Sequence, residues 1–414
     1  MNKSSNKFRH LVWPLVSLAL LLLFNAIFTD NFFKIEIKKQ DSAQAVQAPS
    51  GTVESPQPGT SWITPENYET VNGSAEAAAQ TVQDSAGQQA APEKKDGKGV
   101  SIFGYYLYGT PIDILNQGSK VMVLAIGMTL VIATGGIDIS VGAVMAIAGA
   151  IAALLISMLD AGTCIGAGMG PSVYWIIPVL AALVLATLAG FWNGMLVAGF
   201  GIQPMVATLV LMVAGRGVAQ LITDGQIITF DNPGLVFLCN GHALFLPFSV
   251  WIVVAMYVIF GLLTRKTAFG LFIESVGNNE RASRYAGIEA RRIKWLTYVI
   301  CGFCAGVAGL LAASNIKCAD SNNAGLNLEL DAILATVIGG TSMAGGRFFL
   351  SGSLVGAILI QTLTTTMYMK NVSPAIVAVP KAMVVIIVCL LQSPVFRAKV
   401  LSIFASKAAK GGVQ

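Results

Sequence analysis

The sequence predicts an all-α polytopic membrane protein with about ten transmembrane helices, some of them broken at glycines. Its 414 residues are 55% hydrophobic and only 11% charged, whereas soluble domains carry about a quarter charged residues. The hydrophobic residues gather in long uncharged stretches, and one of these, Ala161–Gly215, is long enough for two spans. A span needs about 20 apolar helical residues, because lipid offers the backbone no hydrogen bonds.

The first predicted span covers residues 11–28 and follows the basic residues Lys3, Lys7 and Arg9. A secretory signal would have an apolar core of roughly 7–15 residues and a small-x-small cleavage site. This run is longer, and no such site follows it. We therefore expect residues 1–33 to form a cytoplasmic start and an uncleaved first helix.

Residues 34–99 form a second unit that is rich in Ala, Gln, Ser, Pro and Gly. Such a composition cannot bury enough apolar surface to offset the entropy lost on ordering. We expect a mostly disordered periplasmic insertion. The alternative is a local structure or a partner contact at Trp62–Pro65.

The membrane domain proper is predicted at residues 100–396, and a basic cytoplasmic tail at 397–414. Turn-rich segments such as Cys164–Ser172 and Gly199–Pro204 separate its helices. The ten expected spans lie near residues 11–28, 117–134, 139–159, 174–198, 203–222, 246–263, 294–313, 328–344, 348–368 and 375–393.

Loop charges orient these spans, because short loops rich in Lys and Arg stay in the cytoplasm. The connection after the sixth span carries Arg265, Lys266, Arg281, Arg284, Arg291, Arg292 and Lys294. By contrast, residues 223–245 hold two aspartates and no Lys or Arg, so that loop should face outward. Both termini are then cytoplasmic.

Several classes of function are disfavoured by what the sequence lacks. There is no G-x-x-x-x-G-K-[S/T] phosphate loop, so the chain does not bind ATP in that manner. The only histidines are His10 and His242, which excludes His-based metal sites and catalytic triads. Cys301 and Cys304 have the spacing of a redox pair but lie inside a span. The net charge of +5 is mostly in loops, so we expect no nucleic-acid partner. We predict no catalytic residue, no metal and no cofactor in this chain.

Ionisable residues inside membrane spans are costly and usually functional. Asp138 and Ser140 follow the pair Gly135–Gly136, which frees the backbone to leave the helix. Asp138 either caps the helix that follows or contacts a polar solute. A similar glycine pair, Gly339–Gly340, ends a later apolar stretch in the same direction, and paired breaks of this kind point to a transport site.

Other polar residues have competing interpretations. Arg216 could snorkel, pair with a carboxylate or line a path. Glu329 and Asp331 suit the positive end of a helix that starts near them, and Lys381 could neutralise an acidic partner. The neutral side chains Asn193, Gln203 and Gln361 could hydrogen-bond a sugar.

Motifs spread over most of the chain resemble those of one family. Residues 134–142, Thr-Gly-Gly-Ile-Asp-Ile-Ser-Val-Gly, are similar to a signature of the ribose/galactose-type ABC sugar transporter permeases, and the set of matches is closest to the galactofuranose importer permease. The further matches are Trp192–Gly194, Ile202–Leu209, Met212–Ile222, Ala319–Gly325 and Leu328–Ile333. The insertion at 34–99 has no counterpart in the resemblance.

The resemblance implies a permease subunit of an importer that moves a monosaccharide across the inner membrane. It implies as partners a separate ABC ATPase that binds ATP, a periplasmic sugar-binding protein, a second or paralogous permease and the lipid bilayer. The candidates for the translocation path or its gating are Gly135, Gly136, Asp138, Ser140, Asn193, Gln203, Arg216, Glu329, Asp331, Gly339, Gly340, Gln361 and Lys381.

The family's ATPase-coupling segment is similar to Val276–Gly287. ABC permeases often carry E-A-A-x-x-x-G there, and alignment on Gly287 moves the acidic position to Glu280. The coupling candidates are Gly277, Glu280, Arg281, Ala282, Ser283 and Gly287. The alternative functions are an ATPase-independent secondary transporter or channel, and a membrane enzyme, which the missing catalytic residues disfavour.

Overall fold

A computed structural model describes residues 4–29, 32–39, 105–160, 175–373 and short parts of 376–386. Three expectations lie largely outside these residues: the insertion at 34–99, most of the tenth span at 375–393, and the tail at 397–414. The connection Cys164–Ser172 lies outside them entirely.

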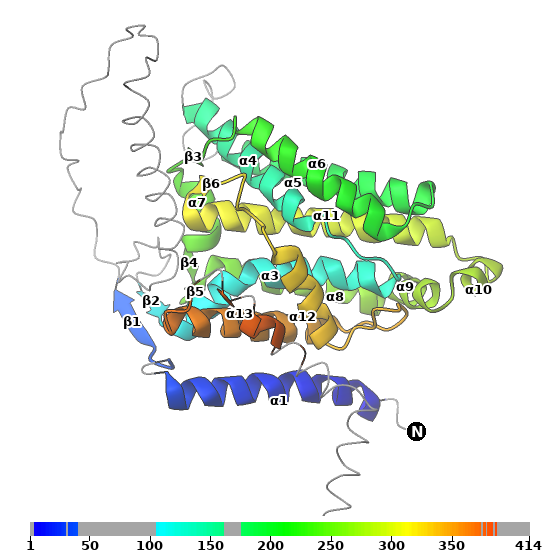
Figure 1. Cartoon of the computed structure of the whole chain (residues 1–414), viewed down its shortest axis with the longest axis horizontal. Coiled ribbons are helices and arrows are strands. Elements are labelled where there is room, and N and C mark those ends of the chain that lie inside the picture. Colours follow the sequence, from blue (N-terminus) through cyan, green and yellow to red (C-terminus); the bar gives the residue numbers. More distant parts are fainter. Residues whose placement is uncertain are drawn as a thin grey trace, which may run out of the picture.

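Helices dominate the described chain, as hydrophobic composition predicts (Figure 1). Their bounds are α1 Ser4–Phe28, α3 Thr110–Ala133, α4 Val141–Asp160, α5 Ile176–Gly194, α6 Pro204–Ile222, α7 Pro233–Asn240, α8 Phe248–Lys266, α9 Ala268–Asn278, α10 Glu280–Tyr285, α11 Ala290–Ile316, α12 Leu328–Ile338 and α13 Leu350–Met369. A π-helical turn, Met195–Gly199, extends α5.

Short strands pair in antiparallel twos, which the all-α prediction missed. Strand β1 (Glu36–Lys39) pairs with β2 (Tyr105–Tyr108), β3 (Ile228–Thr229) with β6 (Cys318–Ala319), and β4 (His242–Ala243) with β5 (Leu246–Pro247). All of them lie at the end of the bundle opposite α9 and α10 (Figure 1). These pairs connect segments that lie between helices.

Seven helices within the described residues are long and apolar enough to cross a membrane: α3, α4, α5 with its π turn, α6, α8, α11 and α13. The prediction of a polytopic, mostly helical membrane protein is therefore confirmed. In α1 the apolar part, Pro14–Ala26, is shorter.

The prediction of a continuous helical span at 328–344 is wrong. Helix α12 has 11 residues and ends at Gly339, so at 1.5 Å per residue it reaches only about half of the hydrocarbon thickness. Gly340 then adopts φ 90°, a conformation that favours glycine, and the chain turns away. Hydropathy does not separate such a half-helix from a complete span.

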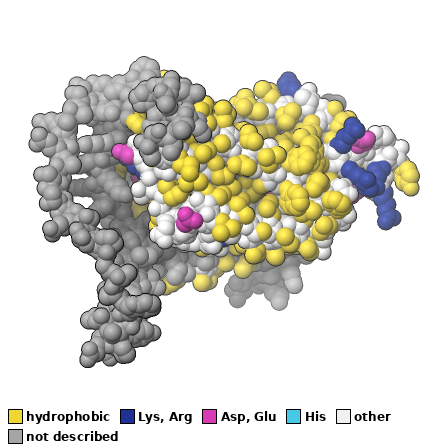
Figure 2. Space-filling model, turned by 90° about the horizontal axis from the view of Figure 1, so that it is seen from above, with side chains coloured by type: hydrophobic (Ala, Val, Ile, Leu, Met, Phe, Trp, Pro, Cys, Tyr) yellow, Lys and Arg dark blue, Asp and Glu magenta, His cyan; other side chains and the backbone are white. Residues whose placement is uncertain are grey.

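The centre of the bundle consists of α3, α4 and α11, most of whose residues are buried, whereas α5, α6 and α8 have few buried residues. Small residues allow close approach: a Cβ on Gly302 of α11 would lie 2.7 Å from the Cα of Gly190 in α5. The exposed side chains of α6, such as Leu209, Val210 and Val213, are apolar. Figure 2 shows hydrophobic side chains over the face that α5 and α6 present, as lipid contact requires.

Candidate functional site

Two helices begin inside the bundle after non-helical segments. Helix α3 ends at Ala133, residues 134–140 are not helical, and α4 begins at Val141. In the second half, α11 ends at Ile316 and residues 317–327 lead to α12. The two starts meet, because a Cβ on Gly142 would overlap the Glu329 carboxylate and lie 2.5 Å from the Gly325 carbonyl oxygen. Two positive helix ends are thus brought together within the protein.

Asp138 organises the first break. It is buried, and its Oδ1 accepts hydrogen bonds from the Ser140 backbone amide at 3.0 Å and the Ser140 hydroxyl at 2.6 Å. Asn193 of α5 donates to the same hydroxyl at 2.8 Å. The accepted amide belongs to Ser140, the residue before α4, so the carboxylate closes a turn ahead of the helix, and capping of α4 by Asp138 stays a prediction. Contact of Asp138 with a solute remains a prediction.

The first break also contains buried polar atoms without a hydrogen bond among the described residues. They are Asn193 Oδ1 and Tyr298 Oη. A Cβ on Gly136 would lie 2.5 Å from that tyrosine oxygen, so only glycine fits beside it. Unsatisfied buried polar groups cost about 1–3 kcal/mol each. The sequence did not single out Tyr298, because a tyrosine within an apolar span looks like ordinary packing.

The second break is held by backbone carbonyls and one ion pair. Arg216 of α6 donates to the Ala324 carbonyl at 2.5 Å and to the Asn322 carbonyl at 3.4 Å. Glu329 is buried, and its Oε2 has no hydrogen-bond partner among the described residues. Lys381 lies 2.9 Å and 3.0 Å from the two carboxylate oxygens of Asp331, which confirms that it neutralises an acidic group.

The remaining candidates lie apart from this cluster. Gln361 of α13 donates to the Thr365 hydroxyl at 3.3 Å and packs against Gly118. Gln203 precedes α6 and is exposed in a pocket that Glu280 also lines, at the end of the bundle where α10 lies. The structure therefore gathers Asp138, Ser140 and Asn193, and it places Gln203 elsewhere.

Within the coupling segment Val276–Gly287, residues Glu280–Tyr285 form the short helix α10. The Asn279 side chain caps it by accepting from the Ala282 amide at 3.0 Å, and the Ser283 hydroxyl donates to the Asn279 carbonyl at 2.9 Å. Gly287 follows the helix with φ 84°, the left-handed conformation that ends many helices. Arg281 is exposed on the helix.

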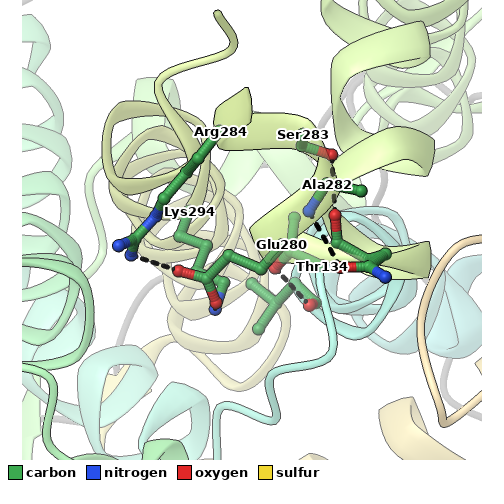
Figure 3. A network of polar contacts seen from close by, with 8 residues as sticks. Thr134, Glu280, Ala282, Ser283, Arg284 and Lys294 are labelled. Atoms are coloured by element: carbon green, nitrogen blue, oxygen red, sulfur yellow. Dashed lines mark hydrogen bonds and ion pairs between the residues drawn. The ribbon is translucent and has the colours of Figure 1, made fainter. Parts of the chain in front are cut away.

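Glu280 joins α10 to the start of α11. Its carboxylate accepts from Arg284 at 2.6 Å and from Lys294 at 2.5 Å (Figure 3). The hydrogen bond from Lys294, assisted by both positive charges, holds the pKa of Glu280 below its usual value of 4.5. The acidic residue displaced from the family pattern thus anchors the helix.

Gly277, at the end of α9, is packed against both glycine-rich segments. A Cβ there would overlap the Ala133 carbonyl oxygen, and the Gly346 amide nitrogen would lie 2.5 Å away. The Gly346 amide itself donates to Ala133 at 2.9 Å. We call this meeting of α9, the end of α3 and residues 339–349 the Gly277 junction. Sequence reasoning missed Gly345 and Gly346, although their positive φ of 86° makes the pair recognisable as a turn.

Comparison with known proteins gives a consistent family. Residues 110–391 match the family described as branched-chain amino acid transport system / permease component. The galactofuranose transporter permease protein of Escherichia coli K12 is 56% identical over 290 residues, which are 70% of this chain and 81% of the relative.

Less similar relatives are named for the import of other sugars. The fructose import permease protein of Bifidobacterium longum is 41% identical over 70% of this chain and 78% of its own length. The ribose import permease protein of E. coli K12 is 34% identical over 70% of this chain and 87% of its own length. No solved structure matches the chain.

Proposed function

The chain belongs to the family of transport-system permease components, and on that premise we propose that it carries a galactofuranose-like monosaccharide through the inner membrane. It is the multi-pass permease subunit of an ABC importer and is not itself an enzyme. ATP is bound and hydrolysed by a separate ATPase subunit, and a periplasmic binding protein delivers the sugar.

The single observation that carries the choice of sugar is the 56% identity to the galactofuranose permease. Fructose and ribose permeases are 41% and 34% identical. The buried groups at the two breaks, with their amide, hydroxyl and carboxylate oxygens, have the chemistry that binds sugar hydroxyls. We place the path for the sugar beside the starts of α4 and α12.

The topology in this proposal has ten membrane crossings, the eighth of them made by the non-helical residues 317–327 together with the short helix α12, and both termini in the cytoplasm. In its support, the N-terminal end of α1 lies at the same end of the bundle as α9 and α10 (Figure 1), where basic residues gather. Tyr285→Cys on α10 should then react with an impermeant thiol reagent only from the cytoplasmic side. Gln226→Cys, after α6, should react only from outside; the reverse pattern would reject the orientation.

Helices α9 and α10 are the segment that we propose docks on the ATPase. Tyr285 is 93% exposed. An exposed aromatic side chain on a charged helix is suited to insert into a groove of a partner protein. Motion of α9 would reach the first break and the residues that follow α12 through the Gly277 junction, where a Cβ on Gly277 would overlap the neighbouring backbone. Binding partners shift such an equilibrium only through different affinities for its states.

Co-purification tests the proposed subunit. The tagged full-length chain, expressed together with the ATPase and the binding protein of its importer, should bring down the ATPase in detergent. Tyr285→Ala should weaken that association by at least tenfold. A chain that purifies without any ATPase and binds none when mixed with it would refute the proposal.

A further inference from the structure

A basic pocket lies at the end of the bundle where α10 packs. It has a volume of about 270 Å³ and is lined by the turn Val197–Pro204 between α5 and α6, and by Glu280, Arg284, Arg291 and Lys294. Figure 2 shows Lys and Arg side chains gathered at this end of the molecule, beside the apolar surface. Two regions distant in sequence, the turn before α6 and the segment from α10 to the start of α11, therefore build one cavity.

The pocket carries an excess of positive charge. One carboxylate, Glu280, faces three cations, and it is hydrogen-bonded to Arg284 and Lys294. Arg291 has no ion pair with any described residue, whereas its neighbour Arg292 pairs with Glu289. Arginine offers a planar fork of donors that matches the oxygens of a phosphate, and Gln203 adds a neutral amide at the wall.

Aromatic residues near this pocket indicate its level relative to the membrane. Trp192 is exposed on α5 one turn before the π turn, and Phe191 packs edge-on against Trp295 with ring centroids 5.0 Å apart. Tryptophans concentrate at the level of lipid headgroups. Phe200, in the wall itself, is 71% exposed. The cavity thus lies where a helical, lipid-facing surface gives way to the charged α10.

We propose that this pocket binds a phosphate group, either as the headgroup of an anionic phospholipid or as the free ion. Basic pockets between membrane helices on the cytoplasmic side bind anionic headgroups. A phosphate there would bridge Arg284 of α10, Arg291 and Lys294 of α11, and the turn before α6. Only the assignment to the cytoplasmic leaflet rests on the proposed topology; the binding does not.

An acidic surface of a partner protein is the competing occupant. The exposure of Phe200 in the wall and of Trp192 on α5 favours lipid, because these side chains would face the bilayer rather than a soluble subunit. Tyr285, the exposed side chain best suited to a protein partner, does not line the pocket.

Native mass spectrometry of the full-length chain in detergent tests the proposal, with phosphatidylglycerol, phosphatidylcholine and inorganic phosphate as probes. The wild type should retain phosphatidylglycerol in preference to phosphatidylcholine. Arg291→Gln should weaken that binding about fivefold, the effect of one surface cation. Arg292→Gln is the matched control, because it removes the same charge at the next residue. The Arg292 side chain is 83% exposed and lies outside the pocket, so this substitution should leave lipid binding unchanged.

The remaining arms identify the source of the phosphate. If inorganic phosphate binds the wild type but not Arg291→Gln, and neither lipid is preferred, the ligand of the pocket is the free ion. The proposal then holds. Equal binding by wild type and both variants, or equal losses in both, overturns it. Lipid binding that survives Arg291→Gln while ATPase association falls would assign the pocket to the partner protein and also overturn it. Matching elution profiles of the variants establish that they fold.

Discussion

At the scale of single residues, glycines that look alike in the sequence differ in their structural roles. Gly277 is in a helical conformation, and its lack of a side chain is required only by the neighbouring Ala133 and Gly346. Gly261 of α8 has open space around its Cβ position. The two positions therefore separate steric contact from helix propensity, since Ala is the better helix former at both.

Gly277→Ala should lower stability by about 1–3 kcal/mol, the usual effect of forcing a methyl group into a packed site. It should also reduce sugar uptake, because the junction links α9 to the first break and to the residues that follow α12. Thermal unfolding of the purified chain and uptake by vesicles measure the two effects. Gly261→Ala should be neutral or stabilising, and equal behaviour of the two variants would contradict the role of the junction.

The pair Asp331–Lys381 is a second residue-scale test. Both side chains are largely buried, with 11% and 17% of their surfaces exposed. Removing one partner leaves an uncompensated buried charge, which costs about 3–5 kcal/mol. Lys381→Met and Asp331→Leu should each lower the unfolding temperature sharply, whereas the double variant should recover most of the loss. A double variant as unstable as the sum of the two would show that the pair is not coupled.

At the scale of elements, most membrane helices could be predicted from the sequence, because apolar length is nearly all that a span requires. The predicted span at 246–263 corresponds to α8, and that at 203–222 to α6. Helix α12 could not be predicted, since its short length is permitted only by the protein around its ends. Nor could the contact between Gly277 and Gly346, which no local pattern encodes.

Helix α10 depends on the turn that ends it. Gly287 has φ 84° and nothing within 4 Å of its Cβ position, so a substitution there strains the backbone without creating a clash. Gly287→Val should impair coupling, lowering the sugar imported per ATP hydrolysed, with an expected strain of about 1–2 kcal/mol. Gly287→Asn is the matched control because asparagine tolerates this conformation. Unchanged uptake by the valine variant would reject the role of this turn.

The anchor of α10 should also respond to pH. Because the pKa of Glu280 is lowered in the folded protein, its contribution is complete above its usual value of 4.5 and is lost as pH falls through the lowered value. Protection of the α10 amides from hydrogen exchange, corrected for intrinsic rates, should therefore fall below pH 4.5. Glu280→Gln should remove this dependence and resemble the acidic state throughout. Persistence of the same profile in that variant would exclude Glu280 as its cause.

At the scale of the whole molecule, the described chain joins the segment of α9 and α10 to two interrupted helices. Identity over residues spanning 70% of the chain places it among permeases, and motifs such as residues 134–142 made that family predictable from the sequence. The cluster of Asp138, Ser140 and Asn193 was partly predictable, because each residue is polar within an apolar stretch. Their mutual contacts were not, since Asn193 comes from a different helix.

The most direct test is uptake by proteoliposomes that contain the purified chain, with or without its ATPase and binding protein. With all components and ATP on the ATPase side, labelled galactofuranose should accumulate inside the vesicles, and omission of the ATPase or of ATP should abolish it. Accumulation that continues without the ATPase and follows an imposed ion gradient would identify a secondary transporter and contradict the account.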